Sequence, residues 1–396
     1  MTDRHQAQPN GSGALSPDLP SNRWPLLRWF VSSGTLGVPQ AAGPVAFSLL
    51  ALSVTGQASG GATMMLAMTL AQVGGAIPIA RLGRGLPLVT FLKLLIFIRT
   101  LALALVALLA TYGSSFTWLI VLAAIAGSVN GAASGYFRAV LNHLAPASAL
   151  PRAVGISATL NEVTFVLAPV AAAGLGTVSP VIAIVAVAVL GAAPGLLVPS
   201  TGSTHIDGIR GVHGSILSAS ISLWLICAAA GGAVVAAIEI GAVALALNFG
   251  YEPALAIVFT VPLCLAAVGG GIWVSVRNRM ATRKGVLARL LVMTLGSALA
   301  ALNLSVTTTV IGTLLIGSVM APLSTYYSLI LDTLAPPQRR AEVFALLRTA
   351  NAIGVIFASA VLTFVSLSMA LIVVTGLLII VSLVVGTALV RRQSAA

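Results

Sequence analysis

The feature that most constrains the fold is a series of long apolar segments separated by short polar connectors. Each segment is about 20 residues long, the length that a helix needs to cross the hydrocarbon core of a bilayer. The segments are apolar on every side rather than at every second position, which favours helices over the strands of a membrane barrel. A chain of 396 residues that is 58% hydrophobic and only 7% charged has too few polar groups to cover a soluble surface. The sequence therefore predicts an all-α membrane protein.

Glycine, proline and charged residues separate these segments and predict twelve transmembrane helices. We place them at 26–53, 62–80, 86–111, 117–141, 153–176, 180–199, 217–247, 254–276, 288–304, 307–331, 342–365 and 369–390.

The charges of the connectors alternate along the chain. One set of connectors contains Arg81, Arg84, Arg152, Arg210, Arg277, Arg279, Arg283, Lys284, Arg339 and Arg340, and the two ends of the chain carry Arg4, Arg23, Arg391 and Arg392. The other set, around 54–61, 112–116, 177–179, 248–253, 305–306 and 366–368, has no Lys or Arg. Because cytoplasmic loops are enriched in Lys and Arg, both termini are predicted to be cytoplasmic. The net charge of +12 thus reflects topology, and no basic module indicates nucleic-acid binding.

An internal repeat divides the chain into two halves. The stretch "GSVNGAASGYFRAVLNHLAP" from Gly127 and the stretch "GSVMAPLSTYYSLILDTLAP" from Gly317 share nine of twenty residues at an offset of 190. We therefore predict a disordered cytoplasmic tail at 1–22, a six-helix half at 23–199, a polar cytoplasmic linker at 200–216 and a second six-helix half at 217–392. Two parallel repeats of six spans are a transporter architecture, with the substrate path between the halves.

The connector "PIARLGRGLPLV" lies between the second and third predicted spans, and it resembles the signature loop of the major facilitator superfamily of secondary transporters. Arg81, Gly83 and Arg84 match the pattern, whereas Ala80 replaces its aspartate. The resemblance covers residues 24–392. It implies the major facilitator fold, alternating access, and a path lined by spans 1, 4, 7 and 10. Because the loop lacks its carboxylate, we expect another pair of charges to latch the cytoplasmic end.

Two further stretches, "LNEVTFVLAP" and "AAIEIGAVALALNFGYEPALA", resemble divergent bacterial members of that superfamily, of the actinobacterial type described as efflux or sugar-type transporters. The first stretch covers the position of the antiporter motif, but Ala168-Pro169 stands where the superfamily has Gly-Pro. This departure weakens the expectation of drug/proton antiport without excluding it.

Few ionisable side chains lie at membrane depth, where each costs at least about 2.5 kcal/mol on insertion scales and therefore needs a partner or a role. Arg138 and Glu162 are close enough in depth to form a buried pair that fixes span 4 against span 5, or to take part in a substrate or proton site. Glu239 has no cation near it in the sequence, which makes it the leading proton-coupling candidate, with Glu162 second. The alternative reading places Glu239 at the interface near the outer end of its span.

Other polar residues complete the candidate path. Asp332 and Arg348 are predicted to pair as a cytoplasmic gate or strut, and Arg99 needs an interior partner that the sequence does not reveal. By the resemblance, the cavity-lining candidates are Gln40, Asn130, Tyr326 and Tyr327. The same residues could instead hydrogen-bond between helices.

These features predict a secondary active transporter that moves a small hydrophobic or amphipathic molecule by alternating access, most consistent with proton-coupled export. The alternatives are uptake of a neutral solute such as a sugar, by symport or uniport, and a non-transporting membrane scaffold or receptor. No catalytic motif is present, so no enzyme, metal or cofactor is expected. The expected partners are the substrate, the lipid bilayer and protons, and the chain is expected to be a monomer in the bacterial plasma membrane.

Overall fold

The computed structural model describes residues 24–57, 59–199 and 217–393, and throughout this part of the chain the regular secondary structure is helical. Twelve of the helices or helix pairs are long and apolar enough to cross a membrane. All twelve predicted spans are present, which confirms the predicted all-α membrane fold. The predicted tail at 1–22 and the linker at 200–216 lie outside the described residues.

The first six spans are built from eight α-helices, because two of these spans are each divided into two helices. They are α1 (Trp24–Leu36), α2 (Val38–Thr55), α3 (Ser59–Leu82), α4 (Leu88–Thr111), α5 (Phe116–Ser128), α6 (Asn130–Leu144), α7 (Leu150–Val178) and α8 (Pro180–Leu197).

The last six spans are each a single α-helix. They are α9 (Ala219–Asn248), α10 (Ile257–Arg277), α11 (Arg283–Leu302), α12 (Val306–Leu334), α13 (Arg340–Phe364) and α14 (Leu367–Gln393). Short 3-10 helices precede or link some of them: η1 (Gly83–Gly85), η2 (Ala147–Ala149), η3 (Pro253–Ala256) and η4 (Pro337–Arg339).

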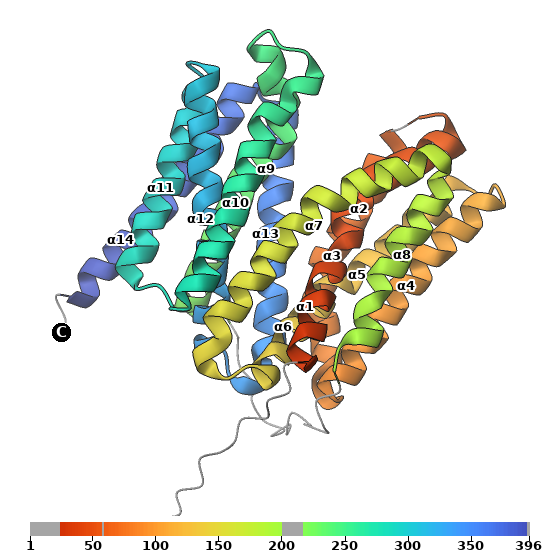
Figure 1. Ribbon diagram of the computed structural model, residues 1–396, viewed down its shortest axis with the longest axis horizontal. Helices are drawn as coiled ribbons and strands as arrows, with labels where there is room; N and C mark the ends of the chain where they lie inside the picture. Colours follow the sequence, from red (N-terminus) through yellow and green to blue (C-terminus); the bar gives the residue numbers. More distant parts are fainter. Residues whose placement is uncertain (1–23, 58, 200–216, 394–396) are drawn as a thin grey trace, which may run out of the picture.

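The two sets of six spans form two bundles, which we call the N half (α1–α8) and the C half (α9–α14). Helices α3, α6 and α7 of the N half contact α10, α12 and α13 of the C half. In Figure 1 the halves meet at the end where α6 and α13 lie together and diverge toward the opposite end, with α7 running obliquely between them. The closed end carries the connectors with Arg81, Arg84, Arg339 and Arg340, and we call it the basic end. The connectors of the opposite end contain no Lys or Arg, and we call it the cation-free end.

Repeat-related glycines set the packing inside each half. A Cβ atom on Gly127 of α5 would collide with the backbone carbonyl of Met68 on α3. In the same way, a Cβ atom on Gly317 of α12 would collide with the backbone carbonyl of Leu263 on α10. Only glycine permits so close an approach of two helix backbones. The offset of 190 in the sequence is therefore a repeat of the structure, in which span 4 packs on span 2 as span 10 packs on span 8.

The first span of the N half is interrupted at Gly37. Pro39 has no backbone N–H to donate, and the N–H groups of Gln40 and Ala41 both bond to the carbonyl of Gly37. The carbonyl of Leu36 is thus left without a donor from its own helix. The fourth span has a second interruption, at Val129 between α5 and α6.

Candidate transport path between the two halves

Two carboxylates from different halves lie near each other in the interior of the membrane-spanning region. Glu162 is on α7 and half-buried, and Glu239 is on α9 with an exposed side chain. They are close enough to interact electrostatically, and Cys264 of α10 lies within the same range of both. Among the described residues, no Arg, Lys or His forms an ion pair with either carboxylate. The two proton-coupling candidates, which the sequence treats separately, therefore form one cross-half acidic pair.

Arg138 does not pair with Glu162, so this sequence prediction is wrong. The Arg138 Nε donates to Ser328 Oγ at 2.7 Å, and its Nη1 donates to Asn142 Oδ1 at 2.9 Å. Its guanidinium Cζ also lies 4.7 Å from the centroid of the Phe344 ring. The side chain extends across the interface to the C half instead of toward span 5.

Asp332 does not pair with Arg348, which is a second correction. Its Oδ1 lies 3.3 Å from Arg340 Nε and accepts a hydrogen bond from Asn142 Nδ2 at 2.6 Å. Arg348 lies two turns further into α13 than Arg340, out of the range of this carboxylate. Arg340 is nearer to Asp332 because both residues lie at the basic end, where α12 ends and α13 begins.

The contacts between α6 and α12 follow the repeat. Arg138 bonds to Ser328 and Asn142 bonds to Asp332, and in both pairs the two residues are 190 positions apart. Equivalent positions of spans 4 and 10 therefore face each other across the pseudo-twofold axis at the basic end. The sequence repeat could have predicted these contacts. When two equivalent spans both face the pseudo-twofold axis, a residue on one span contacts the residue at the equivalent position on the other.

The signature-like loop is latched by a carboxylate from the other half. Arg84 Nε hydrogen-bonds to Glu342 Oε1, and Arg81 Nε lies 3.7 Å from Glu342 Oε2. Glu342 is in the first turn of α13, and its side chain is only 2% exposed. The aspartate missing at Ala80 is thus replaced by an acidic residue on span 11. The sequence contained a signal for this partner, because Asp332 and Glu342 are the two carboxylates that the described chain places near the basic end.

Gly83, the third matching residue of the loop, is required by packing. A Cβ atom there would collide with the ring of Phe91 and the hydroxyl group of Tyr136. The Tyr136 hydroxyl donates to the carbonyl of Ala80 at 3.0 Å, which holds the end of α3 against α6. The loop is therefore anchored to its own half and presents Arg81 and Arg84 to the other half.

The connector that occupies the equivalent place in the C half makes a weaker contact. Asn278, which follows α10, accepts a hydrogen bond from the Arg152 backbone N–H at 2.9 Å and donates to the Ser148 carbonyl at 3.1 Å. Both partners lie at the start of span 5 in the N half. The two cross-half contacts of these connectors thus differ in chemistry: one is an ion pair, and the other is made by a neutral amide.

Arg99 on α4 is 1% exposed, and its interior partners are backbone carbonyls and an amide. Its Nη1 donates to the Leu36 carbonyl at 3.1 Å and to Asn130 Oδ1 at 3.0 Å, and its Nη2 donates to the Gly191 carbonyl at 2.6 Å. It therefore serves the carbonyl that the break in span 1 leaves free. That carbonyl is free because the Gln40 N–H, its expected donor in a continuous helix, bonds to the Gly37 carbonyl instead.

The other polar residues predicted to line the path are largely occupied within the two halves. Asn130 donates to Gln40 Oε1 at 3.2 Å and to Gln72 Oε1 at 2.8 Å, so Gln40 and Asn130 belong to the Arg99 network. Tyr326 and Tyr327 are 2% and 4% exposed and pack against Trp224. In this conformation neither tyrosine ring lines the space between the halves.

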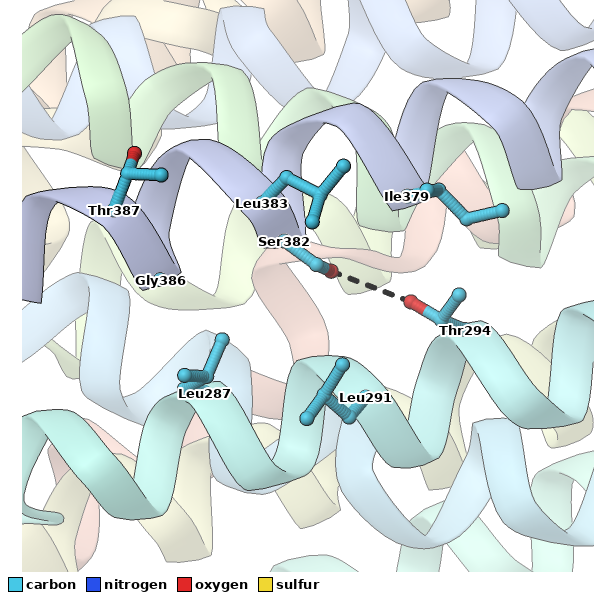
Figure 2. Close-up of a pocket in the computed structure, with 8 residues that line it drawn as sticks. All are labelled: Leu287, Leu291, Thr294, Ile379, Ser382, Leu383, Gly386 and Thr387. Carbon is cyan, nitrogen blue, oxygen red and sulfur yellow. Dashed lines mark hydrogen bonds between the residues drawn. The ribbon is translucent and has the colours of Figure 1, made fainter. Parts of the chain in front are cut away.

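Two grooves lie on the outer helices. Figure 2 shows a groove of about 510 Å³ between α11 and α14, where Thr294 and Ser382 share a hydrogen bond of 3.3 Å at one edge. A second groove of about 390 Å³ lies between α4 and α8, the equivalent pair of the N half. Their linings are almost entirely apolar, as expected of surfaces that face lipid. The polar chemistry lies elsewhere, between the halves.

No protein-family model matches the chain, and no curated protein sequence is detectably similar to it. Several solved structures are similar in fold. The human organic anion transporter MFSD10 superposes with a TM-score of 0.72 at 16% identity, covering 93% of this chain and 100% of its own. A bacterial homologue of the iron transporter ferroportin, in an outward-facing state, gives a TM-score of 0.74 at 13% identity, covering 92% and 98%.

A third similar structure is the fucose:proton symporter of E. coli, with a TM-score of 0.70 at 14% identity and coverage of 92% and 99%. These likenesses, spread over nearly the whole of each chain, show that this protein has the fold of the major facilitator superfamily transporters. The superfamily fold predicted from the loop signature and the repeat is confirmed.

Proposed function

We propose that the protein is a proton-coupled secondary transporter that exports a small amphipathic molecule across a bacterial plasma membrane by alternating access. The fold supports this function, because two six-span halves joined mainly at one end are able to rock about a path between them. The path lies within one chain, so a monomer suffices.

The observation that carries the proposal is the acidic pair formed by Glu162 and Glu239. Two carboxylates within electrostatic range repel each other, and a proton bound to either of them removes this repulsion. Because one carboxylate belongs to each half, any motion that brings the halves together at this depth increases the repulsion. A proton that binds to the pair removes this cost and so links proton occupancy to the closing of the cation-free end.

The contacts that hold the basic end closed determine the other step of the transport cycle. Glu342 with Arg84, and Asp332 with Asn142, join the two halves in the present conformation. If the basic end is cytoplasmic, as its charge predicts, this conformation opens outward and its acidic pair is reached by external protons. Protonation would then favour closing at the cation-free end and opening at the basic end, where the substrate of an exporter is loaded.

The proposal is tested with purified protein in liposomes, using rhodamine 6G, Nile red and dansylglycine as a cationic, a neutral and an anionic dye. We expect at least one dye to move only when a pH gradient is imposed, in the direction opposite to that of the protons. Glu239→Gln and Glu162→Gln should abolish the effect of the gradient. Glu252→Gln, which changes an exposed glutamate next to η3, is the matched control and should behave as wild type.

Other outcomes would contradict parts of the proposal. If both Gln variants remain fully coupled to the gradient, the acidic pair is not the proton site. If the dye moves in the same direction as the protons, the protein is an uptake symporter. If a dye binds without flux under any gradient, a scaffold or receptor on the same fold replaces the transporter.

A further inference from the structure

Arg348 is a cation inside the membrane-spanning region that has no partner in the described part of the chain. It lies eight residues after Arg340 on α13, which is about 12 Å along the helix. It forms no ion pair or hydrogen bond with any described residue, and no charged group interacts with it electrostatically. Its Nε is buried without a hydrogen-bond partner. The two described carboxylates nearest to it in the sequence are already occupied: Asp332 contacts Arg340 and Asn142, and Glu342 contacts Arg84.

The exposure pattern of α13 shows that Arg348 does not face lipid. Ile353, Phe357 and Phe364 are exposed and lie on one side of the helix, whereas Arg348 and Val355 lie on the opposite side by helical periodicity. On that inner side Phe344 is buried, Arg348 is half-buried and Val355 is 39% exposed. On this inner side the first residues of α13 are buried, whereas Arg348 and Val355, further from the basic end, are partly accessible.

A second cation with a spare donor lies nearer the basic end on the inner side of α13. Arg138, from the N half, stacks on the ring of Phe344, and Phe344 precedes Arg348 by one helical turn. The Nη2 of Arg138 is buried without a hydrogen-bond partner. The described carboxylates near this end, Asp332 and Glu342, are paired with Arg340 and with Arg84. Neither Arg138 nor Arg348 forms an ion pair with a described residue, so positive charge is in excess between the halves.

An unpaired guanidinium in a desolvated site is costly unless a ligand completes it. The planar fork of donors on arginine matches an oxyanion such as a carboxylate, sulfonate or phosphate monoester. Further from the basic end the inner side of α13 is apolar at Val355, and the carboxylates of Glu162 and Glu239 between the halves would repel a second negative charge. The position accordingly favours a ligand with one anionic group and an apolar body.

We propose that Arg348 binds the single anionic group of an amphipathic substrate. The inference rests on the proposed transport function, since it names the substrate class of the same path. The apolar body of the substrate would extend along the inner side of α13 toward the cation-free end, and its anionic group would lie next to Phe344.

The test is an equilibrium binding measurement in lipid nanodiscs, which needs neither flux nor a gradient. The probes are dansylglycine, its neutral amide dansylglycinamide and the doubly charged dansylaspartate, followed by fluorescence anisotropy. For the wild-type protein we expect dansylglycine to bind about tenfold or more tightly than either of the other two probes, since one charge-assisted hydrogen bond is worth about a factor of ten or more.

Arg348→Gln should remove the preference for dansylglycine over its amide, and Arg348→Lys should retain part of it. Arg279→Gln, which removes an exposed cation of the connector after α10, is the matched control and should keep the full preference. Size-exclusion profiles and apparent unfolding temperatures establish that each variant is folded.

Two results would overturn the inference: equal or absent binding of all three probes by the wild-type protein, and an unchanged preference in a folded Arg348→Gln protein. The failure of the proposed function is distinguishable from these results. If the protein binds dansylglycine through Arg348 but moves no dye, the anion site is supported and the proposed transport function is contradicted. If a pH gradient drives flux of other dyes but the protein shows no preference for dansylglycine, transport is supported and the anion site is contradicted.

Discussion

The two halves of the molecule share one backbone repeat but differ in how their interiors satisfy polar groups. In the N half, spans 1 and 4 are interrupted near Gly37 and Val129, and Arg99 donates to carbonyls of spans 1 and 6 and to Asn130 of span 4. In the C half, the equivalent spans α9 and α12 are continuous. Hydroxyl pairs instead join its outer spans, with Ser297 and Thr375 2.6 Å apart.

This difference shows that a repeat constrains helix packing more strongly than polar chemistry. The glycine contacts that join spans 2 and 4 recur between spans 8 and 10, because backbone contact leaves no choice of side chain. Polar groups have several ways to be satisfied, so one half uses a buried cation and the other uses neutral hydroxyls. The cross-half connectors differ in the same way, with an ion pair at Glu342 and an amide contact at Asn278.

The largest expected effect tests the polar interiors. Arg99→Met should destabilise the protein by about 3 kcal/mol or more, because the carbonyls of Leu36 and Gly191 and the amide of Asn130 lose their donor at about 1–3 kcal/mol each. Thr375→Val in the C half should cost only about 1 kcal/mol. The measurement is the apparent unfolding temperature in detergent together with the yield of folded protein. Equal effects of the two variants would mean that the halves do not differ in this respect.

The next effect tests the two cross-half connector contacts. Glu342→Gln removes the charge that holds Arg81 and Arg84, and hydrogen bonds to charged groups contribute about 1.5–3 kcal/mol. We expect the equilibrium between the two conformations to shift by about tenfold or more toward opening at the basic end. Asn278→Gly removes the amide contact while allowing the left-handed backbone (φ 43°) at this position, and it should shift the equilibrium less.

This shift is measured as the distance between spin labels at the cation-free end, on Thr55→Cys and Ser366→Cys, after Cys227 and Cys264 are replaced by alanine. Weakening of the basic-end contacts should add a population with a shorter distance between the labels. A larger shift for Asn278→Gly than for Glu342→Gln would show that the amide contact is the dominant latch.

A smaller effect tests the feature that the halves share. Gly127→Ala and Gly317→Ala should each destabilise the protein by about 1–3 kcal/mol, since each methyl group forces two helix backbones apart. Gly174→Ala and Gly269→Ala are the matched controls, because a Cβ atom meets nothing within 4 Å at either position. These controls should be neutral or slightly stabilising. If Gly127→Ala and Gly317→Ala destabilise the protein by different amounts, the two equivalent helix contacts contribute unequally to stability.

Much of the fold was predictable from the sequence, whereas the pairing of charges was not. The twelve spans follow from apolar length, and the repeat follows from the matched stretches at Gly127 and Gly317. The sequence also identified Glu162, Glu239 and Arg348 as side chains that need a role. Their partners could not be assigned, because Arg138 and Asp332 have several candidate partners at similar depth.

The amino-acid sequence alone specifies the number of spans, the alternation of basic and cation-free connectors, and the division into two repeats. These properties depend only on the length, hydrophobicity and charge of successive segments, because these determine which segments span the bilayer and which side each connector faces. The three-dimensional fold was needed to show that Glu342 takes the place of the missing loop carboxylate, that Glu162 lies within electrostatic range of Glu239, and that Arg348 has no partner among the described residues. Such choices depend on the rotation of each helix and on contact between segments far apart in the chain, and neither is encoded in local sequence.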